Sequence, residues 1–142
     1  MEIIYPMFAM FGLTVFVVFR MLYLRYTAAR NEEINLRFFK SYRGYEEPEH
    51  LRVISRHVIN LFEMPMLFYV VGILILQTGQ TGVLTLSLAW AYVALRGGHS
   101  YIHLTSNRVM SRFRVFLASF LVLVALWLTM FIGLVSAAGT PS

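Results

Sequence analysis

The sequence predicts an all-α integral membrane protein: a single domain, residues 1–142, folded as a four-transmembrane-helix bundle. Two observations lead to this prediction. The chain is 58% hydrophobic and only 13% charged, whereas a soluble domain carries about a quarter charged residues. All twelve Lys and Arg residues fall within residues 20–56 and 96–114, which is the charge pattern of four spans with two basic connections on one side.

Four apolar stretches are long enough to cross a hydrocarbon layer, which takes roughly 20 helical residues. We expect spans at residues 3–24, 57–76, 83–104 and 115–138. The first stretch starts without a basic n-region and is too long for a signal sequence. We therefore interpret it as a retained first span.

The connections between these spans differ in charge. Residues 31–50 form the longest polar stretch, interpreted as a cytoplasmic loop with some helical character, and the link at 106–114 is short and basic. The uncharged, turn-forming residues 77–82 should lie on the opposite side. Both termini then lie outside, with residues 137–142 as a frayed tail, and both basic loops are cytoplasmic.

Composition excludes several classes of function. The chain has no cysteine and no Asp, so it offers neither thiol chemistry of its own nor a Ser–His–Asp triad. Its net charge of +5 comes from basic residues that flank apolar spans, where they set topology and contact anionic lipid headgroups rather than nucleic acid.

The second expected span contains Arg56, Asn60 and Glu63, whose offsets of four and seven residues place them on one helical face. Pro65 follows and should loosen that turn. Ionisable groups inside a membrane are costly, and they are functional candidates for that reason.

The third expected span contains Arg96, His99 and His103, again on one face, and Asn107 continues the spacing. The adjacent glycines 97 and 98 are small enough to permit close helix packing. We expect the polar faces of the second and third spans to meet inside the bundle.

Three interpretations of these residues remain open. In a structural one, Glu63 pairs with Arg96 or Arg56, and the amide and imidazoles complete a buried network. In a functional one, Arg56 and Arg112 grip the carboxylates of an anionic ligand near the cytoplasmic helix ends. In a third, His99 and His103 bind a metal or haem, with Glu63 as a further metal ligand, although companion motifs are missing.

The remaining two histidines, His50 and His57, lie where the second span begins. We interpret both as solvated or capping groups at the level of the lipid headgroups.

The run from Arg56 to Pro65 resembles the R-x-x-x-N-x-x-E…P signature of the MAPEG superfamily (membrane-associated proteins in eicosanoid and glutathione metabolism). The run from Leu95 to Arg108, followed by Arg112-Phe113, looks like the bacterial branch of that superfamily. The resemblance covers most of the chain and is strongest between residues 52 and 116.

The resemblance implies a homotrimer in a bacterial inner membrane, with glutathione bound between protomers near the cytoplasmic face. It assigns Arg112 as the catalytic, thiolate-stabilising residue, with Arg108 as the second match. The cofactor-binding residues that we expect are Arg25, Arg56, Asn60, Glu63, Arg96, His99, His103 and Arg108.

The implied function is a glutathione-dependent transferase or peroxidase acting on lipophilic electrophiles, delivered through an apolar groove between helices. A thiol with a pKa near 8.5 is mostly protonated at neutral pH, and a nearby guanidinium favours the thiolate. The alternative is a non-catalytic protein of the same fold that binds lipid or a partner. It gains support where tyrosines that orient glutathione in the eicosanoid and microsomal members are replaced here by His103, Phe113 and Phe116.

Overall fold

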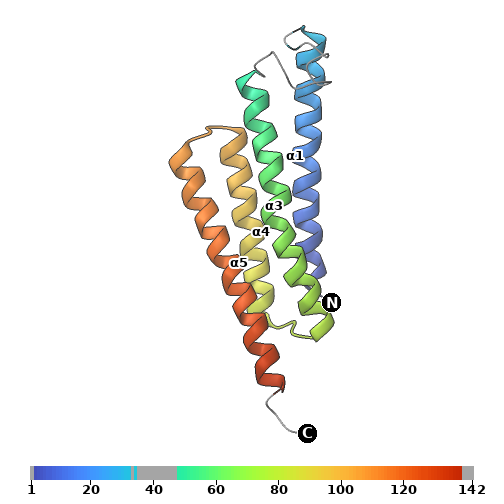
Figure 1. Cartoon of the computed structure of the whole chain (residues 1–142), viewed down its shortest axis with the longest axis vertical. Helices are drawn as coiled ribbons and strands as arrows, with labels where there is room; N and C mark the ends of the chain where they lie inside the picture. Colours follow the sequence, from blue (N-terminus) through green and yellow to red (C-terminus); the bar gives the residue numbers. More distant parts are fainter. Residues whose placement is uncertain (1, 33, 35–47, 139–142) are drawn as a thin grey trace.

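A computed structural model describes residues 2–32, 34 and 48–138 of the chain. Its helices lie lengthwise against one another as an elongated bundle (Figure 1). They are α1 (Ile4–Arg30), α3 (Glu49–Thr78), α4 (Val83–Leu104) and α5 (Val109–Ala138). The expected loop at residues 31–50 and the expected tail at 137–142 lie mostly outside the described residues.

The helices are longer than the apolar stretches that predicted them. α1 continues to Arg30, α3 begins at Glu49 and α5 begins at Val109, where spans 3–24, 57–76 and 115–138 were expected. Arg, Glu and Leu are good helix formers, so the helices continue beyond the apolar stretches into polar sequence.

Three of the helices, α1, α3 and α5, are long and apolar enough to cross a membrane by length and composition. The expected span at 83–104 forms α4, but it does not meet the same measure. The physical reason is the C-terminal part of this helix, which carries Arg96, His99 and His103. All three side chains are buried in the bundle.

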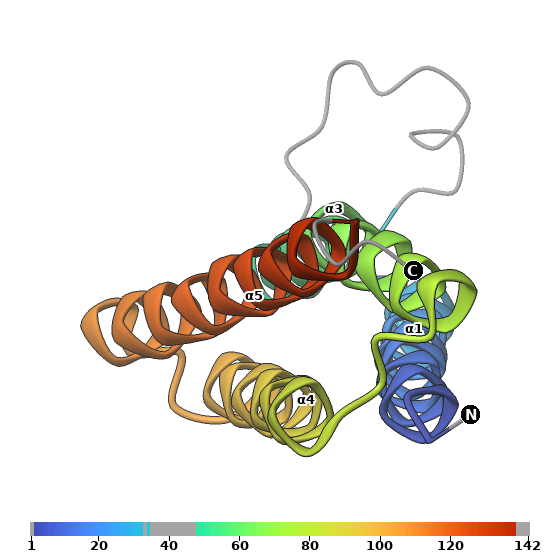
Figure 2. The ribbon, with the colours of Figure 1, turned by 90° about the horizontal axis from the view of Figure 1, so that it is seen from below.

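Each helix has two neighbours in a ring: α5 packs most closely on α4 and α1 on α3, and contacts of α1 with α4 and of α3 with α5 close the ring (Figure 2). α3 and α4 are joined by the short turn at residues 79–82, where Gly79 adopts a left-handed φ of 67°. Thr85 accepts the Gly82 N–H at 2.8 Å and so caps the start of α4.

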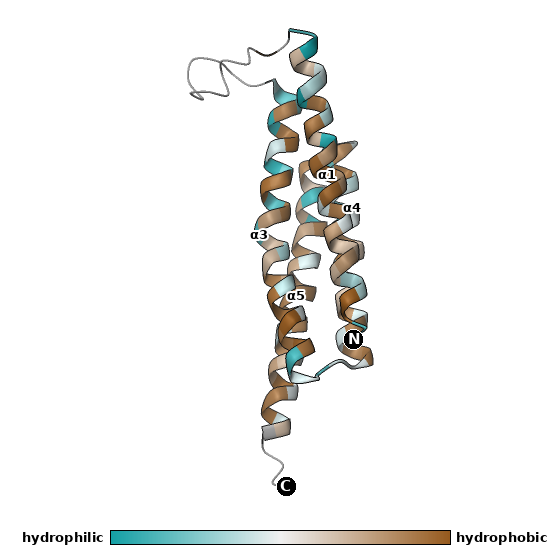
Figure 3. Cartoon of the chain, turned by 90° about the vertical axis from the view of Figure 1, so that its right-hand side faces the viewer, coloured by the Kyte–Doolittle hydropathy of each residue, from teal (hydrophilic) through white to brown (hydrophobic). Residues whose placement is uncertain are grey.

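The interior changes character along the bundle axis. Toward the α3–α4 turn it is apolar, and the Phe68 and Tyr92 rings stack there with centroids 4.7 Å apart. Gly72 lets Met7 of α1 approach α3 closely, since a Cβ on this glycine would lie 2.7 Å from the Met7 sulfur. Polar residues gather toward the opposite end (Figure 3). We call this end, where α1 ends, α3 begins and α4 connects to α5, the basic end.

Candidate functional site

The most deeply buried charge described in the structure is Arg96 of α4, which is 0% exposed. Its Nη2 donates to two oxygens of Asn60 on α3, the side-chain Oδ1 at 2.5 Å and the main-chain O at 3.2 Å. Its Nε and Nη1 have no hydrogen-bond partner among the described residues. A buried charge is ordinarily paired with an opposite charge, whereas the contacts described for this guanidinium are with a neutral amide.

Three imidazoles group together in the same interior, and two of them, those of His57 and His99, interact with this guanidinium. The His57 and His103 rings stack with centroids 4.3 Å apart and planes inclined by 25°. The His99 ring lies 5.6 Å from His57 and 5.9 Å from His103. Neither nitrogen of His57 has a partner in the described part of the chain, and the same is true of His103 Nδ1.

The burial of His57 corrects the expectation that it is solvated or caps a helix. Its side chain is 0% exposed. The reason is its position on α3, three residues after Ile54 and four before Leu61, both of which are buried. His50, in contrast, is exposed at the first turn of α3.

Arg112 joins the group from the first turns of α5. Its main-chain O lies 3.2 Å from His99 Nδ1, and since a carbonyl only accepts, this nitrogen must carry the proton. Arg112 Nη1 donates to the side-chain oxygen of Asn107 in the α4–α5 connection. Asn107 does not extend the α4 stripe, because α4 ends at Leu104 and Asn107 adopts a left-handed φ of 46°.

Six residues therefore come together at the basic end, and we call them the polar cluster. They are His57, Asn60, Arg96, His99, His103 and Arg112. Three helices contribute to this cluster, and five of its six members were among the expected site residues.

The other expected site residues lie elsewhere. Arg56 and Glu63 are exposed on the outer face of α3, and neither has a hydrogen bond or ion pair with another described residue. The pairing of Glu63 with Arg96 or Arg56, expected in the structural interpretation, is therefore wrong for the protomer. Arg25 donates to Ser55 Oγ on α3 at 3.0 Å, and Arg108 is exposed just before α5.

The expectation that two polar helix faces meet inside the bundle is half right. The α4 face is buried, but of the α3 face only the half-buried Asn60 turns inward far enough to reach Arg96. The expected glycine packing is also only partial. A Cβ built on Gly98 would lie 3.9 Å from Val115, an ordinary contact distance, whereas one on Gly97 would have no neighbour within 4 Å.

The described residues give no geometric support to the third interpretation, a metal site. In the described ranges no group of three or more His, Cys, Asp or Glu side chains is arranged to hold a metal ion. Glu63, the further ligand considered, lies on the outer face of α3.

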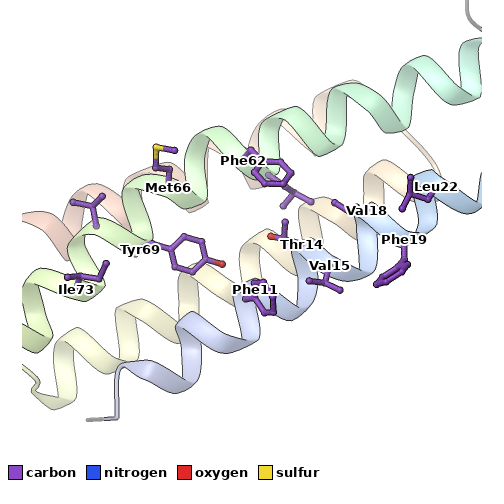
Figure 4. Close-up of a pocket in the computed structure, with 12 residues that line it drawn as sticks. Phe11, Thr14, Val15, Val18, Phe19, Leu22, Phe62, Met66, Tyr69 and Ile73 are labelled. Carbon is purple, nitrogen blue, oxygen red and sulfur yellow. The ribbon is translucent and has the colours of Figure 1, made fainter. Parts of the chain in front are cut away.

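An apolar groove of about 490 Å³ runs between α1 and α3 on the outside of the protomer (Figure 4). Phe11, Val15 and Phe19 line it from α1. Phe62 and Met66 line it from α3, beside Glu63, and Tyr69 points across it toward Thr14. The groove therefore adjoins the exposed polar face of α3.

This helical architecture agrees with a match to a known protein family. Residues 3–132 match the family model described as MAPEG family. The chain belongs to the MAPEG family. No curated protein and no solved structure gave a match. Membership suggests a membrane function related to glutathione or eicosanoid metabolism. The match takes in α1, α3 and α4 of this MAPEG chain in full and α5 as far as residue 132.

Sequence reasoning missed two parts of this site. His57 was assigned to the surface, although its spacing from Leu61 could have placed it among the buried residues of α3. Ser100 was not considered, yet it is 2% exposed and its Oγ has no partner among the described residues. Its offset of four from Arg96 is the signal that could have found it.

Proposed function

We propose that this MAPEG protein is a membrane-embedded glutathione-dependent transferase or peroxidase that acts on lipophilic electrophiles. The observation that carries the proposal is the buried Arg96 guanidinium, with two nitrogens unpartnered in the described structure and only neutral Asn60 oxygens bonded to it. Such a group favours an anionic ligand, and a peptide with carboxylates fits that chemistry.

Asn60 connects this interior charge to the outer face of α3. Because its Oδ1 accepts from Arg96, its amide NH₂ is left to donate away from Arg96. Arg56 and Glu63 lie on that outer side, one turn before and one turn after Asn60. The α3 face thus offers a guanidinium, an amide donor and a carboxylate, which match the carboxylates and the ammonium of glutathione.

The exposure of Glu63 supports a site completed by a second copy of the chain. Glu63 lies within the expected second span, and a charge that faces lipid at the centre of a helix costs about 2.5–3.5 kcal/mol. Covering this face with another protomer and a ligand removes that cost. We therefore propose a homotrimer with glutathione bound between protomers, at the cytoplasmic side.

Bound glutathione would supply the thiol that forms a bond to the electrophile. Arg112 is the residue that holds the negative charge of its sulfur. The Arg112 guanidinium is held by Asn107, and its main-chain carbonyl is held by His99. A half-exposed guanidinium has five N–H groups, so donors remain available for the thiolate. The α1–α3 groove, which adjoins the exposed face of α3, holds the apolar body of the electrophile.

The test is glutathione binding by calorimetry to the detergent-purified oligomer, followed by turnover with an activated aryl halide and a lipid hydroperoxide. Arg112→Ala should bind glutathione but lose about 100-fold in kcat, the usual effect of removing one charge-stabilising donor. Arg114→Ala is the matched control, because Arg114 is exposed two residues further along α5. Absence of saturable binding to a folded wild-type oligomer would overturn the proposal.

A further inference from the structure

Two adjoining cavities lie on the α1–α4 side of the bundle, apart from the outer face of α3. The upper cavity, about 580 Å³, lies at the basic end between α1, the start of α3 and the end of α4. The lower groove, about 460 Å³, runs from it between α1 and α4. Arg20, Leu104 and Thr105 line both, so the two spaces lie side by side.

The upper cavity is polar and carries opposite charges on separate walls. Arg20 lines it from α1 and Glu49 from α3. Both side chains are exposed, and no ion pair joins them in the described structure. His103 forms the inner wall; it is 8% exposed, and its Nδ1 has no partner among the described residues. The cavity therefore offers a guanidinium and an imidazole, acting as an N–H donor, to an anion, and a carboxylate to a cation.

The lower groove is mostly apolar. Phe16 and Leu13 line it from α1, one and two turns deeper than Arg20 respectively, while Gly97 and Tyr101 line it from α4. Gly97 leaves the groove open, since a Cβ built there meets nothing within 4 Å. From Arg20 to Leu13 the groove descends about 10 Å along the helix axis, at 1.5 Å per residue.

A polar cavity with both charges above a narrow apolar groove has the shape of one amphiphilic molecule. A wholly polar ligand would leave the groove unfilled, and a wholly apolar one would desolvate Arg20 and Glu49 without pairing them. The basic end also lies where basic residues meet lipid headgroups.

We propose that this cavity and groove bind a single phospholipid with an amine-bearing headgroup. The phosphate lies at Arg20 and His103, the ammonium lies at Glu49, and one acyl chain enters the groove along Gly97. His103 is the one member of the polar cluster that lines this cavity, so the lipid site does not depend on thiol chemistry.

Native mass spectrometry of the oligomer, titrated with lipid, tests this proposal. The probes are phosphatidylethanolamine, phosphatidylglycerol with the same acyl chains, and free phosphoethanolamine. Wild-type protein should retain phosphatidylethanolamine in preference to phosphatidylglycerol and should bind free phosphoethanolamine weakly, because the groove holds the chain. Equal retention of both lipids would overturn the headgroup assignment.

Two variants locate the site. Gly97→Leu fills the groove and should weaken retention of phosphatidylethanolamine about tenfold or more, since forcing atoms into occupied space carries such a penalty. Gly12→Leu is the matched control, because Gly12 also has nothing within 4 Å and lines neither space. Loss of retention in both variants, or in neither, would place the lipid elsewhere and overturn the proposal.

Glu49→Gln gives a second, independent readout that requires no filling of the groove. It should reduce the preference for phosphatidylethanolamine over phosphatidylglycerol about two- to fivefold, the size expected for an exposed ion pair. An unchanged preference in this variant would remove Glu49 from the headgroup site and overturn the assignment of the amine.

Discussion

The Arg96 guanidinium is held by Asn60 through two oxygens of the same residue, one from its side chain and one from its main chain. This contact joins α4 to α3 at the level where the interior becomes polar. It also orients the Asn60 amide, because the oxygen that accepts from Arg96 must face inward. One contact therefore links packing inside the protomer to the donor offered on its outer face.

Asn60→Asp and Asn60→Leu should separate these two roles. The Asp side chain is nearly the same size and gives Arg96 a carboxylate, so the free energy of unfolding should be unchanged or higher. Glutathione affinity should fall at least about tenfold, since the amide donor is lost and the guanidinium is neutralised. The Leu variant leaves a buried charge without its acceptor and should lose about 3–5 kcal/mol of stability.

Thermal unfolding in detergent and calorimetry measure the two quantities on the same samples. An Asn60→Asp protein that binds glutathione as tightly as wild type would show that the unneutralised Arg96 charge does not recruit the ligand.

Periodicity predicted the helices, and it correctly grouped Arg96, His99 and His103 on one face of α4. It could not say which face of α3 turns inward, because the spacing of Arg56 and Glu63 fixes only their positions relative to each other. The burial of neighbouring Ile54 and Leu61 decides this. His57 lies between them at helical spacing and is therefore buried as well. The contact between Arg96 and Asn60 depends on the crossing of two helices, which no local pattern in the sequence records.

His57→Phe should leave the protein as stable as wild type or stabilise it by about 1–2 kcal/mol. Phenylalanine keeps a ring against His103 and removes two buried nitrogens that have no described partner, and leaving such groups unsatisfied costs about 1–3 kcal/mol. His99→Phe is the control, because it removes the contact with the Arg112 carbonyl and should cost about 1 kcal/mol.

Thermal unfolding of both histidine variants in one detergent compares them directly. A His57→Phe protein destabilised as much as His99→Phe would mean that the His57 nitrogens make contacts that stabilise the fold.

Gly72→Val should destabilise the protein by about 1–3 kcal/mol, the usual cost of overfilling a packed interior. A Cβ at this position would lie 2.7 Å from the Met7 sulfur, whereas one at Gly12 meets nothing within 4 Å. Gly12→Val should therefore leave stability nearly unchanged. Adding Met7→Ala to Gly72→Val should restore part of the loss, because two residues in contact are energetically coupled. Additive losses in the double variant would show that this close approach of α1 to α3 does not limit stability.

Asn107 combines a strained main chain with a side chain that positions Arg112, and two substitutions distinguish these contributions. Its φ of 46° is unfavourable for most side chains but not for glycine. Asn107→Ala should therefore lose about 1 kcal/mol of stability, whereas Asn107→Gly should fold as well as wild type. Both remove the oxygen that accepts from Arg112 Nη1, so both should lower kcat for thiol transfer by a similar factor. Thermal unfolding should show that Asn107→Ala is less stable than Asn107→Gly, and steady-state kinetics should show that the two variants have equal activity. Full activity in Asn107→Gly would mean that Arg112 reaches the thiolate without this support, and its position would then have to come from His99 alone.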